Sequence, residues 1–311
     1  MKSFKNNFIV RKLIEVILTL LTVSLISFIL MKISPIDAAE AYARRNSFAM
    51  NPEMLESLRE DMGLNKPIVV QYINWISKAL RLDFGSSYVT GRDVFTDVVG
   101  ALGITGKVVI ISGLIQLVGA LFVGCLSYYT KRTLANKIIE LITIGAISIP
   151  AFFFAGLFID IFAVKFAWMQ VATNKGFFRY FPAAFCLAIS GIAFFGQLLS
   201  TSVEKYASTD SALYARCRGI SEKRLILFHV LPMALREVLP NFMQMLGIAM
   251  AGSMVVERIF SLPGLGYMII EAILYRDSPV IHAVILFLGF ALVFFNILAS
   301  VIERSLSRGI I

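Results

Sequence analysis

The recurrence of long apolar stretches is the feature that most constrains this chain. A membrane-spanning helix needs about 20 mostly apolar residues. Six segments meet this length, and they are residues 8–33, 101–128, 138–164, 182–203, 242–259 and 280–302. Only 16% of the residues are charged, whereas soluble domains have about a quarter. The pattern therefore predicts an all-α membrane protein with six transmembrane helices.

Lysine and arginine are unevenly distributed among the connecting loops, and this predicts the orientation. They concentrate in three places, which are the loop 129–137, the loop 204–239 and the C-terminal tail. Basic loops stay in the cytoplasm, so both termini are predicted to be cytoplasmic. The net charge of +9 is then explained by these loops, and it does not indicate a nucleic-acid partner.

The first apolar segment has a second interpretation. Basic residues precede it and Ala39-Glu40-Ala41 follows it, as in a cleaved signal peptide. Its apolar run is longer than a signal peptide requires, which favours a retained span. Both interpretations leave the N-terminus in the cytoplasm.

The chain divides into residues 1–33 with the first span, an extracytoplasmic insertion at 34–99, and a five-span core at 100–311. In the insertion, Asn51 and Pro52 predict the start of a helix that Gly63 ends. A second helix is predicted over residues 67–80. Its apolar face is expected to pack on the spans or on another protein, and it consists of Val69, Tyr72, Ile73, Ile76 and Leu80.

The loop 204–239 is predicted to form a small basic helix–turn–helix. Asp210 can cap a helix over residues 211–218, and Gly219 can end it in the left-handed conformation. Ser221 can cap a second helix that runs toward Leu231. Such a projection suits docking on a soluble partner, and the alternative is an ordinary basic loop.

Catalytic, nucleotide and metal signatures do not emerge from the sequence. Residues 103–107 approach a phosphate-binding loop, but that pattern requires Gly at 101 and Ser or Thr at 108, where Ala101 and Val108 stand. His229 and His282 lack accompanying cysteines or carboxylates, so no metal cage is expected. We therefore predict a protein that is not an enzyme and that holds no cofactor of its own.

Some residues inside the predicted spans are candidates for the pathway or for helix packing. Lys107 and Glu140 lie near span ends, where they can reach water, whereas Asp160 lies deeper and is a candidate to line a pathway. Small residues permit close helix contact, as at Gly247, Ala251 and Gly252. Pro263, Gly264 and Gly266 break the chain after the fifth span and predict a short re-entrant element up to Pro279.

Nearly the whole chain resembles one family, the first permease of dipeptide, oligopeptide and nickel ATP-binding-cassette (ABC) importers. The most specific match is the long block at residues 257–266 and 276–281. The other matching segments are Asn51-Pro-Glu-Met-Leu, Gly63-Leu64, Pro67, Gln71-Tyr72, Leu82-Asp83-Phe84-Gly85-Ser86-Ser87 and Ser148-Ile149-Pro150-Ala151-Phe152-Phe153.

This resemblance implies a type I ABC importer permease in a bacterial inner (plasma) membrane. The expected partners are a second permease, two ATPases that bind the ATP, an extracytoplasmic solute-binding protein and membrane lipid. It also implies an EAA-type coupling loop that docks on an ATPase, with Asp210, Ala215, Arg216, Arg218, Gly219 and His229. The chain departs from the family pattern at Gln197 and Ser200, where two arginines are usual, and at Pro232, which is expected to shorten the loop helix.

Two substrate classes fit the resemblance. The stretch with Trp75 and residues 78–85 is most similar to nickel or metal-chelate permeases, with short-peptide permeases close behind. A self-sufficient secondary transporter or channel is the alternative of another class. It would require an internal repeat or coupled charges in the membrane, and the sequence offers little of either.

Overall fold

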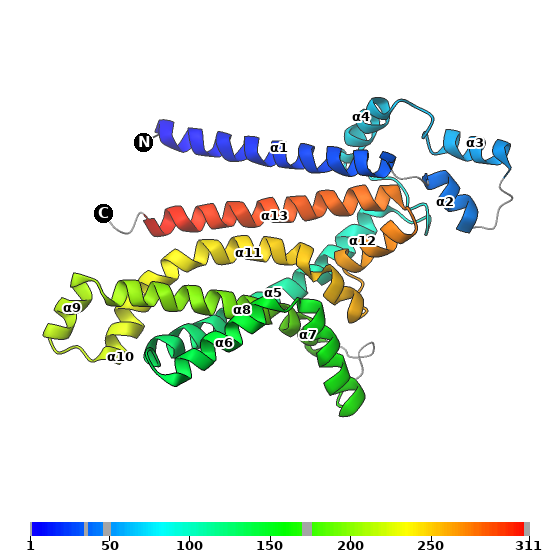
Figure 1. Ribbon diagram of the computed structural model, residues 1–311. Helices are drawn as coiled ribbons and strands as arrows, with labels where there is room; N and C mark the ends of the chain where they lie inside the picture. The colour runs from blue at the N-terminus through cyan, green and yellow to red at the C-terminus, as the bar shows by residue number, and fades with distance from the viewer. Residues whose placement is uncertain (1, 34–36, 46–50, 170–175, 308–311) are drawn as a thin grey trace. The chain divides into compact units, whose positions relative to one another are not determined.

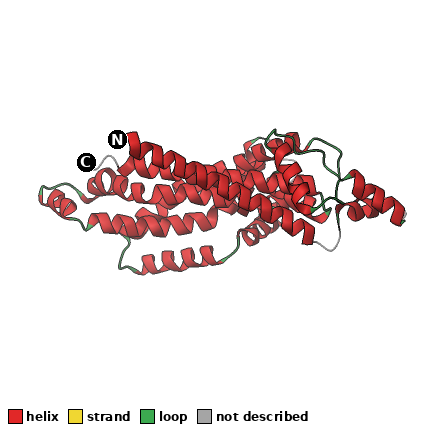
Figure 2. Cartoon of the chain, turned by 90° about the horizontal axis from the view of Figure 1, so that it is seen from above, coloured by secondary structure: helices red, strands yellow, loops and turns green. Residues whose placement is uncertain are grey.

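The computed structural model describes residues 2–33, 37–45, 51–169 and 176–307. Within these ranges the elements are helices, and the one pairing of extended backbone is an isolated bridge between Ser86 and Asp93 (Figures 1 and 2). The chain forms two units. Unit 1 contains residues 1–105 and 263–293, and unit 2 contains residues 106–262 and 294–311.

Unit 1 is built around the first span. Its helices are α1 (Lys2–Ile33), α2 (Ala38–Arg45), α3 (Pro52–Asp61), α4 (Ile68–Ala79) and α12 (Leu265–Leu274), with the first turns of α5 (Val94–Tyr129) and the first half of α13 (Ser278–Ser307). The helices α1 and α13 lie side by side, because a Cβ at Gly289 would be 3.6 Å from both Leu20 and Val23. Between them, Ser27 Oγ lies 2.8 Å from His282 Nδ1, and Phe28 stacks on the His282 ring.

Unit 2 is a helical bundle. It contains the rest of α5, then α6 (Leu134–Ser148), α7 (Ala151–Phe158), the π-helix η1 (Ile159–Lys165), α8 (Phe177–Ala207), α9 (Asp210–Cys217), α10 (Glu222–Leu225), the π-helix η2 (Ile226–Val230) and α11 (Leu231–Ile259). Glycines allow α5 and α8 to approach closely. A Cβ at Gly119 would lie 2.7 Å from Ile192, and one at Gly196 would lie 2.6 Å from Val123.

The predicted third span is not one straight helix. The helices α6 and α7 meet at an angle of 98°, so the predicted span 138–164 is a bent pair of helices. Ile149 adopts extended backbone, with φ −93° and ψ 127°, as expected of a residue before proline. Five helices are long and apolar enough to cross a membrane, or six if the bent pair counts as one. The predicted helical membrane class is confirmed.

The helices α3 and α4 begin and end close to where the sequence predicts. The Asn51 side chain accepts a hydrogen bond from the N–H of Glu53 at the start of α3, and Gly63 follows its end with φ +68°. The predicted packing face of α4 is partly wrong, because Val69, Ile73 and Leu80 are exposed. The side that packs inward carries Tyr72, Trp75, Ile76 and Ala79.

Pro232 does not shorten the loop helix as expected. The chain remains helical from Glu222 to Ile259, and the wide π-turns of η2 come directly before the proline. A proline ring clashes with the carbonyl four residues earlier in a regular α-helix. The wider turn provides the room, so Pro232 takes a place in the first turn of α11.

Candidate functional site

A hairpin of two short helices, α9 and α10, with the π-helix η2 directly after α10, connects the ends of α8 and α11 (Figure 1), and η2 is counted here as part of the hairpin. Thr209 occupies the capping position of α9, and Asp210 is the first helical residue, so the predicted cap lies one residue too late. Gly219 has φ +79°, and the N–H of Ile220 bonds to the carbonyl of Ala215 at 3.2 Å. This is the left-handed helix ending that the sequence predicts.

Gly219 is needed for its backbone conformation. A Cβ at this position would meet nothing within 4 Å, and the residue is exposed. Only the positive φ therefore disfavours a larger side chain there. Ala215, in contrast, is buried, so a larger side chain there would meet its packed neighbours.

Arg216 braces the hairpin from within. Its guanidinium donates to both carboxylate oxygens of Glu222, at 2.9 and 3.0 Å, and to the carbonyl of Ala207 at 2.8 Å. The hydroxyl of Tyr128, at the end of α5, donates to the same carboxylate at 2.9 Å. The bond to Glu222 is the main reason that the pKa of Arg216 is raised. This brace joins α9, α10 and the last carbonyl of α8.

Two further ion pairs hold the base of the hairpin. Lys205, near the end of α8, pairs with Glu237 of α11 at 3.0 Å, and Lys131 pairs with Glu204. The sequence did not identify these acidic partners or Glu222. Glu222 lies six residues after Arg216, across the glycine turn, and this spacing matches no helical pattern.

The hairpin exposes large apolar side chains beside basic ones. Tyr214 is 65% exposed and Phe228 is 71% exposed. The exposed apolar side chains are Leu213, Tyr214, Leu227 and Phe228, and the exposed charged or ionisable ones beside them are Arg218, Lys223, Arg224 and His229. Exposed apolar groups with a polar rim are typical of surfaces that contact another protein.

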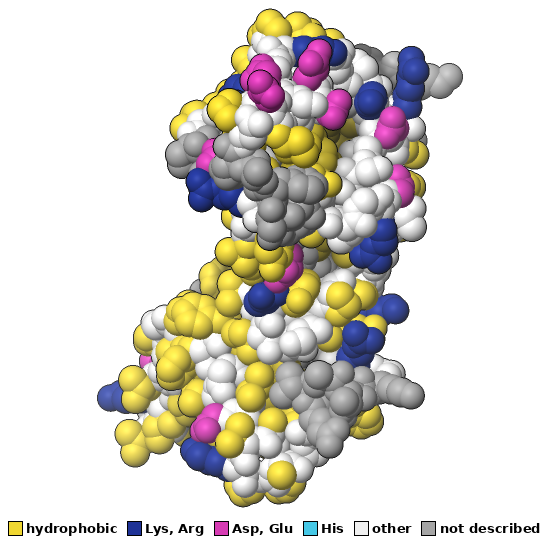
Figure 3. Space-filling model, turned by 90° about the vertical axis from the view of Figure 1, so that its right-hand side faces the viewer, with side chains coloured by type: hydrophobic (Ala, Val, Ile, Leu, Met, Phe, Trp, Pro, Cys, Tyr) yellow, Lys and Arg dark blue, Asp and Glu magenta, His cyan; other side chains and the backbone are white. Residues whose placement is uncertain are grey.

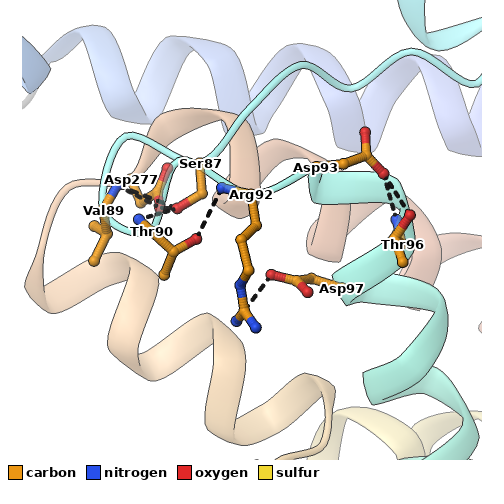
Figure 4. Close-up of polar contacts among 8 residues, drawn as sticks. All are labelled: Ser87, Val89, Thr90, Arg92, Asp93, Thr96, Asp97 and Asp277. Atoms are coloured by element: carbon orange, nitrogen blue, oxygen red, sulfur yellow. Dashed lines mark hydrogen bonds and ion pairs between the residues drawn. The ribbon is translucent and has the colours of Figure 1, made fainter.

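A second polar site joins two distant segments of unit 1 at Asp277 (Figure 4). Its carboxylate accepts a hydrogen bond from the Ser87 hydroxyl at 2.5 Å, and bonds from the N–H groups of Tyr88 at 3.0 Å and Val89 at 3.4 Å. Asp277 is only 2% exposed. Burial, and then the Asp277 charge, raise the pKa of Tyr88. The sequence did not single out Asp277, although both segments belong to the family-like blocks.

The break after the fifth span has the expected local structure. Gly264 precedes the first turn of α12, and the first N–H of that helix, on Leu265, donates to the hydroxyl of Thr105 at 2.8 Å. Leu265 and Gly266 are buried. Two non-glycine residues near the ends of this segment have positive φ, Ser261 at +52° and Arg276 at +57°, which is uncommon.

The remaining pathway candidates lie on different elements of unit 2. In α11, Gly247 is buried, whereas Ala251 and Gly252 are exposed. A Cβ at Gly252 would meet nothing within 4 Å, so its packing role remains a prediction. The exposed stripe of α11 consists of Asn241, Gln244, Ile248, Ala251, Gly252 and Val255. Asp160, on η1, pairs with Lys165 at 2.8 Å and is about half exposed.

Glu257, near the end of α11, is fully buried and accepts a hydrogen bond from Ser253 at 2.9 Å. Unit 1 contains a cavity of about 1120 Å³ whose lining includes Arg59, Arg81, Glu60 and Asp83. Side chains of both charge signs therefore line the cavity. In the described part of the chain, no group of three or more His, Cys, Asp or Glu could hold a metal ion.

Comparison with known proteins gives consistent matches over the whole chain. A family model for the binding-protein-dependent transport system inner membrane component matches residues 117–311, and the model for the N-terminal part of such membrane components matches residues 5–106. A putative peptide transport system permease protein of Brucella abortus is 28% identical over 303 residues, covering 94% of this chain and 95% of the relative. The glutathione transport system permease protein GsiC of Escherichia coli is 27% identical over 304 residues, covering 98% of each.

The fold also has a counterpart among solved structures. The crystal structure of an amino acid ABC transporter with histidines matches with a TM-score of 0.52 and 20% identity, over 68% of this chain and 94% of that one. At this identity the match concerns the fold alone.

Proposed function

This chain belongs to the family of binding-protein-dependent transport system inner membrane components, and from this premise we propose that it forms half of the substrate pathway of an ABC importer. A second permease would complete the pathway. Two cytoplasmic ATPases would bind the ATP, and a solute-binding protein would deliver the substrate outside. The chain itself would perform no catalysis.

The observation that carries this proposal is the braced hairpin of α9 and α10. Its exposed Tyr214 and Phe228 offer an apolar contact for a soluble partner. Arg216 links both hairpin helices and the end of α8. A movement of the bound ATPase would therefore pass to the spans α8 and α11 without being lost in a flexible loop.

The exposed stripe of α11 supports the pathway role. The stripe begins with two polar residues, Asn241 and Gln244, and ends near two small ones, Ala251 and Gly252. All four are exposed. In lipid, polar side chains face protein or a water-filled space, and small residues mark close helix contacts. The stripe thus suits the second permease and the pathway between the two.

The proposed orientation places the hairpin and both termini in the cytoplasm. The basic residues of the hairpin, among them Lys223 and Arg224, favour that side. The short helices α2, α3 and α4 then lie on the outer side, where the solute-binding protein arrives.

Short peptides are the proposed substrates. The relatives from Brucella abortus and Escherichia coli are named for transport of peptide and of glutathione, which is itself a small peptide. Nickel or a metal chelate remains the second candidate, on the resemblance of residues 75–85 to metal-chelate permeases.

Reconstitution tests the proposal directly. Proteoliposomes with both permeases, both ATPases and the binding protein should accumulate a labelled tripeptide when ATP is inside, and should ignore a nickel chelate. Liposomes with this chain alone should accumulate neither. Accumulation by the lone chain under a proton or sodium gradient would instead establish a secondary transporter, and uptake of the chelate alone by the complete assembly would reverse the substrate assignment.

A further inference from the structure

The helix α4 has an apolar side that no other part of the described chain covers. Val69 is 62% exposed, Ile73 is 54% exposed and Leu80 is 81% exposed, and Val70 lies beside them. The opposite side packs inward through Tyr72 and Trp75. Figure 3 shows, at the top of the view where α3 and α4 lie, hydrophobic side chains exposed next to charged ones. Contiguous apolar surface of this kind marks a contact with protein or with lipid.

The contacts between α4 and the first span α1 indicate that α4 lies at the level of the membrane and not in the water above it. The Tyr72 hydroxyl lies 2.9 Å from Ser24 Oγ, and the ring of Phe28 lies 5.5 Å from Tyr72 and 6.0 Å from Trp75. Ser24 comes nine residues before Ile33, the last residue of α1. At a rise of 1.5 Å per residue, it lies about 13 Å below the outer end of that helix.

This part of α1 belongs to the hydrocarbon region of the bilayer. Residues 16–31 contain no charged side chain, and Lys32 is the first one at the outer end. A hydrocarbon core about 30 Å thick would therefore hold Ser24 and Phe28 in its outer half. Because α4 contacts both residues, α4 lies beside the last turns of the span.

The charged and aromatic residues on and next to α4 are of the types that are common at the level of the lipid headgroups. Lys66 precedes the helix, and Lys78 and Arg81 lie at and beyond its end; all three are exposed. In the described part of the chain, none of these three makes an ion pair. Helices that lie in the membrane interface combine an apolar side with such cations, which attract anionic lipid headgroups. Tyrosine and tryptophan, as at positions 72 and 75, are enriched at the same level.

We propose that α4 is an interfacial helix of the outer leaflet, with Val69, Val70, Ile73 and Leu80 in contact with lipid and its cations among the headgroups. A soluble binding protein is a poorer occupant, because it approaches from water and would have to displace lipid to reach side chains at this depth. The inference goes beyond the proposed function, since it concerns how the outer unit is held and is independent of the substrate.

Spin labels test the proposal in the complete assembly in nanodiscs that contain phosphatidylglycerol. Cys125, Cys186 and Cys217 are replaced by serine, and single cysteines are introduced at Val69, at Ile73 and, as a control on α3, at Ser57. Dissolved oxygen, which concentrates in the hydrocarbon region, should increase the spin relaxation rate of labels at Val69 and Ile73. A water-soluble nickel chelate should leave the relaxation rate of these labels unchanged. The label at exposed Ser57 should show the reverse.

Other results would overturn the proposal. Access of the nickel chelate to the label at Ile73 would place α4 in water. Protection from both reagents, or protection that appears only when the binding protein is added, would show a protein partner instead.

A second measurement needs no substitution. A phospholipid with a photoactivatable group on its acyl chain is reconstituted with the wild-type assembly and irradiated, and trypsin then releases residues 60–78, because it cleaves after Arg59 and Lys78 but not at the Lys66–Pro67 bond. Fragment masses of this peptide are expected to place lipid adducts within residues 67–78, and no adducts are expected on residues 46–59, the peptide that carries most of α3. Adducts on α1 without any on residues 67–78 would contradict the proposal even if the labelled variants failed to assemble.

Discussion

Gly219 is the residue on which the hairpin turn depends most directly. Its φ of +79° costs a β-branched residue about 1–2 kcal/mol. We expect Gly219→Val to insert normally and to lose most of its ATPase coupling, measured as substrate-stimulated ATP hydrolysis by the reconstituted importer. Gly219→Asn is the matched control, because asparagine tolerates this conformation better, and it should keep most of the activity. Equal activity of the two variants would exclude a role for the turn.

The Arg216–Glu222 brace is predicted to act as a unit. Arg216→Lys retains the charge but cannot donate to two carboxylate oxygens and a carbonyl in one plane. We expect fewer molecules transported per ATP hydrolysed, because the hairpin moves without carrying α8 with it. Glu222→Gln should lower the same ratio, and the double variant should resemble either single one. Strictly additive losses would show that the two residues act separately.

Asp277 is predicted to hold two segments of unit 1 together, residues 87–89 and the turn before α13. Asp277→Ala removes the acceptor for Ser87 and for two N–H groups, and each buried group left without a partner costs about 1–3 kcal/mol. A lower midpoint of thermal unfolding and reduced uptake are expected. The control is Asp61→Ala, since Asp61 is exposed and its loss should shift neither quantity. An unchanged midpoint for Asp277→Ala would mean that the segments are held by other contacts.

At the scale of elements, the sequence predicts the features that depend only on neighbouring residues, such as helix ends and turns. The bounds of α3 and the Gly219 turn follow from caps and from glycine conformation within a few residues. The prediction from hydropathy does not include the bend at Pro150. Hydropathy measures how apolar a segment is, but it contains no information on whether the helix axis changes direction. The packing face of α4 is only partly predicted, because that helix has two apolar sides and tertiary contacts decide which one is covered. The bond between Ser87 and Asp277 joins residues 190 positions apart, so no local pattern could reveal it.

The exposed stripe of α11 gives a prediction for the whole helix. Gly252→Leu adds a bulky side chain where a partner helix is expected to approach, at a position where an added Cβ meets no atom of the described chain within 4 Å. We expect the second permease to dissociate during purification, as judged by size-exclusion chromatography. Gly145→Leu, at another open position on α6, is the matched control and should leave the pair intact. An intact pair with Gly252→Leu would indicate that this position faces lipid or the open pathway.

At the scale of the whole molecule, the orientation can be tested with two single cysteines in a background without native cysteines. Ser211, on the hairpin, and Ser57, on α3, are both exposed. The cysteine at position 211 should react with a membrane-impermeant maleimide only from the cytoplasmic side. The cysteine at position 57 should react only from the outside. The opposite pattern would overturn the orientation derived from the basic loops.

The glycines between α5 and α8 also limit how unit 2 can move. Gly119, Gly124 and Gly196 each lie against a bulky side chain of the facing helix. The surfaces of the two helices therefore interlock. Sliding one past the other by less than a full turn would push a branched side chain against backbone, and close-packed interiors do not yield gradually to such a clash. We therefore expect α5 and α8 to move together as one rigid body, with hinges in the segments that connect them to the rest of the chain.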